Sequence, residues 1–216
     1  MTKMRKDQER GFTIVELLIA TAVLSTLLVV VSVMMANIGR LYYKGINQAK
    51  MQENVRSVVD EISDRLQLNN SSVGRYNTVD PVKAYCIGTT RYTYILGQQL
   101  SSTHKHVLWR DTIGAGTCTK ADLNADNPSI TTGGSNGSEL ITTRSRLSQF
   151  SIIPTDSPYV VTMKLVYGDD DQLADPNNDG IPFTGPDVSC LSQSGNQFCA
   201  TAALTTTVVQ RTTGSN

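Results

Sequence analysis

Residues 11–16 read Gly-Phe-Thr-Ile-Val-Glu, and an uncharged apolar run follows them over residues 17–36. The run has no Pro or Gly, and as one helix it would rise about 30 Å, enough to cross a bilayer core. Basic residues on one flank of a span hold that flank in the cytoplasm. Those before this run are Lys3, Arg5, Lys6 and Arg10. The sequence therefore predicts one membrane-spanning helix, with everything after about residue 37 outside. Glu16 is the anomaly, because an intramembrane carboxylate is costly without a functional partner.

Two plainer explanations of this segment are a cleaved secretory signal and a simple signal anchor. A secretory signal has a shorter apolar region that ends in a small-residue cleavage site, and neither feature is clear here. A simple anchor accounts for the apolar run but leaves Gly11-Phe12 and Glu16 unexplained.

Residues 10–20, Arg-Gly-Phe-Thr-Ile-Val-Glu-Leu-Leu-Ile-Ala, resemble the signal of type IV prepilins and type II secretion pseudopilins. The resemblance implies cleavage between Gly11 and Phe12 and methylation of the new N-terminus by a prepilin peptidase. It places Glu16 fifth in the mature chain, where the family's acid pairs with the terminal amine of a neighbouring subunit. Other pilin or pseudopilin subunits are the implied partners.

The resemblance and the apolar pattern together divide the chain into four parts. We expect a leader over residues 1–11, a transmembrane and assembly helix over 12–36, an amphipathic helical stem over 37–68 and an extracytoplasmic β-rich domain over 69–216. The expected location is the cytoplasmic membrane first, and a cell-surface or periplasmic filament afterwards.

The stem carries an apolar stripe at spacings of three and four residues, which predicts one face of a helix. Its members are Ile38, Leu41, Tyr42, Gly45, Ala49, Gln52, Val55, Val59, Ile62 and Leu66. The stripe fits either the packing face for the outer domain, which we favour, or a seam for a partner helix. Glu61 and Arg65 are expected to form a solvated i,i+4 pair. Gly39 and Gly45 either permit local bending or are simply tolerated.

The periodicity changes to two after Pro81, which predicts strands. The predicted strands cover residues 82–87, 91–96, 104–110, 139–142, 147–153, 159–167 and 205–211, with a long polar loop over 111–138. One long helix followed by mainly antiparallel strands predicts an α+β fold, with the helix on one face of the sheet, as in pilins.

Four cysteines lie in the predicted outer domain, where disulfides persist. Of the three pairings, we favour the two that are local in sequence, Cys86–Cys118 and Cys190–Cys199. A metal site that joins a cysteine to His104 and His106 has the wrong spacing for zinc. These histidines are instead expected to be exposed on a strand, and Trp109 to pack in the core.

A calcium loop is a second hypothesis for the outer domain. Asp175, Asn177 and Asp179 alternate before Gly180, as in the first half of an EF-hand loop. Position twelve is a proline, however, and Asp187 follows one residue later. An Asx-rich surface turn explains the same composition. No other cofactor is expected.

Composition and motifs favour a structural role. The net charge is zero, or about −2 without residues 1–11, so a nucleic-acid partner is not indicated. No catalytic constellation is identified, so we expect no enzyme. The expected function is a minor pilin or pseudopilin, because residues 52–66 and 205–211 loosely resemble PilW-like minor pilins and J-type minor pseudopilins. The alternatives are an adhesive or DNA-uptake pilin and, less favoured, a membrane-anchored enzyme.

Overall fold

A computed structural model describes residues 12–69, 72–78, 80–102, 104–114, 116–131, 133–154, 156–174, 188–191 and 198–211. Its first element is the helix α1 (Ile14–Leu68), which is continuous through Gly39 and Gly45. Backbone contacts divide the chain into two units, one up to Tyr42 and a head domain from Tyr43 onward. The long helix predicted from the sequence is therefore confirmed.

In the first unit, α1 keeps its apolar side chains on the surface. Leu17, Leu24 and Met34 are each more than half exposed, and the helix is long and apolar enough to cross a membrane. Ile38, Leu41 and Tyr42 are more than half exposed as well, so this part of the predicted stripe is not buried in a core.

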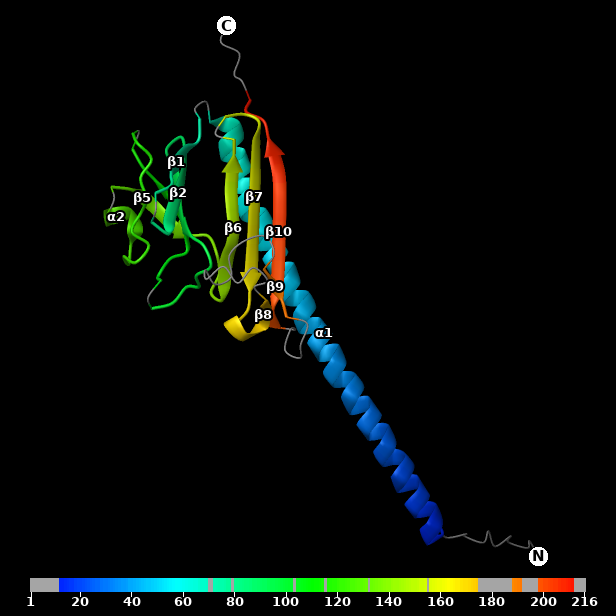
Figure 1. Ribbon diagram of the computed structural model, residues 1–216. Coiled ribbons are helices and arrows are strands. Elements are labelled where there is room, and N and C mark those ends of the chain that lie inside the picture. Colours follow the sequence, from blue (N-terminus) through cyan, green and yellow to red (C-terminus); the bar gives the residue numbers. More distant parts are fainter. Residues whose placement is uncertain are drawn as a thin grey trace, which may run out of the picture. The chain divides into compact units, whose positions relative to one another are not determined.

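The described part of the head domain contains three antiparallel sheets (Figure 1). The five-stranded sheet follows chain order, with β1 (Gly74–Tyr76), β2 (Val82–Ile87), β3 (Thr90–Ile95), β4 (Leu108–Thr112) and β5 (Ser135–Glu139). The three-stranded sheet places β7 (Tyr159–Tyr167) between β6 (Ser145–Ile153) and β10 (Ala200–Val208). A small ribbon pairs β8 (Leu173–Ala174) with β9 (Ser189–Cys190). A long helix followed by antiparallel sheets is α+β, consistent with the pilin fold.

The part of α1 that lies in the head domain buries one face in the core. Val55, Val59, Ile62 and Leu66 are almost fully buried, as the stripe predicts, and Met51 joins them. Burying one such side chain contributes about 1.5–3 kcal/mol. Figure 1 shows these turns of α1 behind the β6–β7–β10 sheet. For this segment, the prediction that the stripe packs against the outer domain is confirmed.

Several boundaries and one ion pair differ from the sequence-based expectations. The strand predicted over residues 104–110 corresponds to β4, which begins at Leu108. The predicted loop over 111–138 contains α2 (Pro128–Thr131) and most of β5. β5 reads Ser-Asn-Gly-Ser-Glu, which has poor strand propensity, so its pairing with β4 is decided by tertiary context. The last strand is Ala200–Val208 rather than 205–211.

Glu61 does not form the predicted solvated pair with Arg65. Its carboxylate accepts hydrogen bonds from Arg110 Nη1 at 2.9 Å and from the Tyr92 hydroxyl at 3.2 Å. Arg65 Nη1 donates instead to Thr90 Oγ1, at 2.9 Å. Both side chains of the expected pair therefore fasten α1 to the five-stranded sheet. The partners on β3 and β4 become visible only in the folded chain.

Candidate assembly site

The N-terminus of α1 is closed by a reciprocal cap between Thr13 and Glu16. Glu16 Oε2 accepts hydrogen bonds from the Thr13 backbone N–H and hydroxyl, both at 2.9 Å. The Glu16 N–H donates in turn to Thr13 Oγ1 at 3.2 Å. A Thr followed three residues later by Glu is the capping-box pattern, which satisfies donors that a helix start leaves open. The cap fixes the Glu16 carboxylate beside the backbone of residues 12 and 13.

The apolar run after this cap has its polar groups satisfied within the helix. All four hydroxyl side chains in it donate to a carbonyl of the preceding turn, at 2.7–3.0 Å. These residues are Thr21, Ser25, Thr26 and Ser32. Unsatisfied polar groups cost several kcal/mol in lipid, so this pattern suits a membrane interior. Glu16 is then the only charged side chain between residues 12 and 36.

Phe12, the residue before the cap, has 89% of its surface exposed. Gly11, on the other side of the predicted cleavage site, lies outside the described residues. The exposed Phe12, the capped carboxylate and the apolar helix surface together form what we call the assembly site. It can offer an acid and an apolar surface to a neighbouring helix.

The profile described as the prokaryotic N-terminal methylation motif matches residues 6–32. The chain carries the N-terminal signal of type IV pilins and pseudopilins. This match spans the predicted cleavage site, the capping box and most of the apolar run. No curated protein and no solved structure matches the chain. The pilin signal favours a structural subunit over an enzyme.

The four cysteines form two disulfides within the head domain. Cys86 is bonded to Cys118, and Cys190 to Cys199, with Cα–Cα distances of 5.7 and 5.8 Å. These are the two local pairings that the sequence favours. The first joins β2 to the segment after β4, and the second joins β9 to the start of β10.

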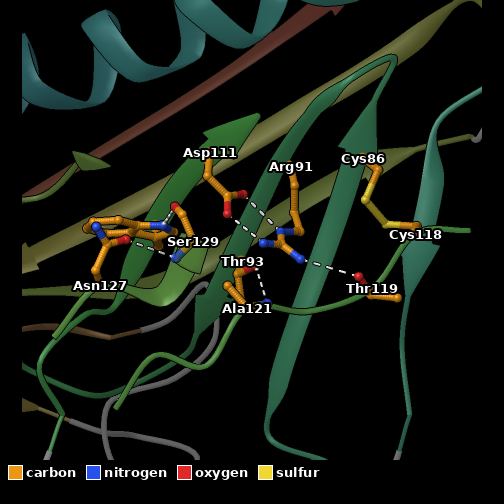
Figure 2. Close-up of polar contacts among 10 residues, drawn as sticks. Cys86, Arg91, Thr93, Asp111, Cys118, Thr119, Ala121, Asn127 and Ser129 are labelled. Atoms are coloured by element: carbon orange, nitrogen blue, oxygen red, sulfur yellow. Dashed lines mark hydrogen bonds and ion pairs between the residues drawn. A yellow bond between two sulfur atoms is a disulfide. The ribbon is translucent and has the colours of Figure 1, made fainter. Parts of the chain in front are cut away.

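A buried ion pair lies near the first disulfide (Figure 2). Arg91 Nε donates to Asp111 Oδ1 at 2.8 Å and Arg91 Nη2 to Oδ2 at 2.5 Å, and both side chains are fully buried. Arg91 Nη1 also donates to Thr119 Oγ1 at 3.3 Å, one residue after Cys118. The pair was missed from the sequence, because Arg91 and Asp111 become partners only through the β3–β4 register.

The segment between β4 and β5 is held over the same face of the sheet. The Ala121 N–H donates to Thr93 Oγ1 at 3.0 Å, and Trp109 Nε1 donates to Ser129 Oγ at 3.0 Å. A Cβ on Gly137 would lie 2.2 Å from the Trp109 ring, so the close approach of β5 requires glycine there. This cover, opposite the helix, explains why all six residues of β3 are buried.

His104 and His106 do not occupy the exposed strand positions expected of them. Both precede β4, and the His106 ring packs 4.3 Å from the Trp109 ring. His106 Nδ1 lies 3.4 Å from Glu139 Oε2. Burial raises the pKa of the Glu139 carboxyl, although the N–H groups of Leu108 and Val107 donate to it and oppose that shift.

Two other sequence features concern a metal site and a catalytic serine. The residues of the calcium hypothesis, Asp175, Asn177, Asp179 and Asp187, lie outside the described residues. Within the described part of the chain, no three His, Cys, Asp or Glu side chains gather as metal ligands. Residues 133–137 match the spacing G-x-S-x-G, but Ser135 begins a strand rather than the strand-to-helix turn of a nucleophile elbow.

Proposed function

We propose that this chain is a structural subunit, a minor pilin or pseudopilin, of a type IV pilus or type II secretion-like filament. The observation that carries the proposal is the assembly site: one capped acid at the start of an otherwise uncharged run over residues 12–36, mostly within the matched signal. Helices in lipid associate largely through close packing of their surfaces. The hydroxyl groups of the apolar run are all hydrogen-bonded within the helix, so its surface suits such packing.

Processing would precede assembly. A prepilin peptidase would cut between Gly11 and Phe12 and methylate the new amine of Phe12. The cut releases a positive charge next to the capped carboxylate of Glu16. In a water-poor helix bundle, a charge that lacks a partner is strongly disfavoured. Pairing of the Phe12 amine with the Glu16 of a neighbouring subunit would therefore set the axial register of the filament.

The location follows from the same helix. The basic leader would remain in the cytoplasm, residues 12–36 would span the membrane, and the stem and head domain over 37–216 would lie outside. Disulfides persist in that compartment, which agrees with two bonded pairs in the head domain. After extraction from the membrane, the subunit would enter a surface or periplasmic filament, and a minor subunit would act in priming its assembly.

Three variants separate the charge of Glu16 from its cap. Glu16→Ala removes both, Glu16→Gln keeps a capping side chain without charge, and Thr13→Val keeps the charge without the hydroxyl cap. We expect all three to be cleaved. The two Glu16 variants should be lost from the sheared filament fraction, whereas Thr13→Val should be incorporated. Immunoblots of membranes and filaments measure both steps. Incorporation of Glu16→Gln at the wild-type level would contradict the pairing role.

A further inference from the structure

In the part of the chain that the structure describes, one edge of the three-stranded sheet has no partner strand. This edge is β10, the outermost strand of the sheet (Figure 1). Its register with β7 runs through nine residue pairs without a bulge. The strand contains no Pro and no charged residue. In natural proteins, bulges, prolines or charged residues usually protect an edge strand, because an unprotected edge pairs with other strands.

The backbone direction of β10 shows which of its groups face outward. In an antiparallel pair, residues alternate between bonding to the partner strand and pointing both backbone groups away from it. The Thr201 carbonyl points away from β7, since it accepts a hydrogen bond from Gln48 Nε2 of α1 at 2.7 Å. Ala203, Thr205 and Thr207 share this orientation by alternation. Thr205 fits this orientation. Its side-chain hydroxyl lies 3.2 Å from that of its register partner Thr162, and side chains come this close in pairs whose backbones do not hydrogen-bond to each other.

A groove adjoins this edge within the head domain. It has a volume of about 520 Å³, and its lining includes Val55 and Ala202. One wall is the flank of α1 with the exposed side chains of Gln52, Glu53 and Arg56. The groove is of the size that holds ligands in proteins. Gln48 occupies the edge at Thr201, and Ala203, Thr205 and Thr207 further along the strand are exposed residues.

We propose that the β10 edge and this groove bind an extended strand from another subunit of the same filament. Outward N–H and C=O groups at every second residue match a polypeptide backbone, and this is how β-strand addition gains affinity. Alternate side chains of the added strand would enter the groove, where Glu53 and Arg56 offer one acid and one base. Within the head domain, the helix α1 supplies a wall of the groove beside the β10 edge. The assignment of the partner rests on the proposed function.

Residue-resolved hydrogen exchange of the full chain tests this directly. In detergent, the amides of Ala203, Thr205 and Thr207 should exchange fast, while those of Ala202, Leu204 and Thr206 are protected by β7. In filaments, the three edge amides should slow by about tenfold or more. Protection of the edge in dilute isolated chain would overturn the proposal. Protection that appears in isolated chain only at high concentration would assign the edge to a second copy and would also overturn it.

Backbone variants provide a second measurement. Ala203→Pro removes one outward N–H, which an edge strand tolerates, whereas Ala203→Ser keeps it. Both should retain the melting temperature of the parent, but only Ala203→Pro should be depleted from filaments. Leu204→Pro removes an N–H that faces β7 and should lower the melting temperature.

The outcomes separate this proposal from the function on which it rests. Filaments that contain the chain with fast edge amides, or with Ala203→Pro at the wild-type level, would overturn the strand-addition proposal alone. A processed chain that never enters filaments would overturn both proposals.

Discussion

Asp111 is a carboxylate without access to solvent, held by two hydrogen bonds from Arg91. A buried charge that loses its partner costs about 3–5 kcal/mol. We therefore expect Asp111→Ala to lower the unfolding free energy of the full chain in detergent by about that amount. Asp126→Ala is the matched control, because Asp126 pairs with Lys105 while its side chain is 94% exposed. Its loss should cost no more than about 1 kcal/mol. Equal effects of the two substitutions in denaturant titrations would contradict the structural role of the buried pair.

Glu139 should make the stability of the fold depend on pH with the opposite sign to that of most structural carboxylates. Its pKa is raised by burial above the usual 4.5, so the folded state binds the proton more tightly than the unfolded state. Stability from this group is therefore greatest below pH 4.5 and falls as the pH rises through the shifted pKa. Glu139→Gln should flatten this decline in melting temperature. The nearest basic group is His106, whose Nδ1 lies 3.4 Å from Glu139 Oε2. The control is Glu53→Gln, at an exposed position; an unchanged slope in Glu139→Gln would refute the assignment.

The residue scale also shows what sequence reasoning can find. Glu16 stands out because it is a lone acid beside 20 uncharged residues, so local sequence is enough to identify it. The Arg91–Asp111 pair has no local signal, since its members are 20 residues apart and meet through strand register. Glu61 shows the same limit. Its i,i+4 neighbour Arg65 is a reasonable partner in an isolated helix, but β4 supplies Arg110 in the folded chain.

At the scale of elements, the two disulfides are expected to contribute unequally. The sequence separation is 32 residues for Cys86–Cys118 and 9 residues for Cys190–Cys199. Closing the longer loop removes more chain entropy, by about 1 kcal/mol in the loop-closure description. Replacing Cys86 and Cys118 by serine should therefore destabilise the chain by about 2–5 kcal/mol, more than the same change at Cys190 and Cys199. Denaturant unfolding of the two double variants provides the comparison, and the reverse order would argue against this account.

The elements differ in how far their sequences predict them. α1 is predicted almost to the residue, because an uncharged run and then a stripe at helical spacing leave no other regular structure. β7 is equally clear from its branched and aromatic residues. β5 could not be predicted, since Ser135–Glu139 has no strand propensity and forms only beside β4. The open edge of β10 also needed the structure, because sheet order decides which strand is outermost.

At the scale of the whole molecule, one helix would serve as membrane anchor, assembly surface and packing face of the head domain. The matched signal covers residues 6–32, and the downstream head domain is joined to it through the same continuous helix. This arrangement accounts for an exposed apolar surface that would otherwise be a liability in water. Under the proposed function, processing at Gly11 would be the step that creates the charged terminus used in assembly.

The most direct test is mass spectrometry of the N-terminal peptide of this chain, recovered from sheared filaments. The account predicts a peptide that begins at Phe12 and carries one N-methyl group. A filament-borne chain that begins at Met1, or a processed chain found only in the membrane fraction, would contradict it.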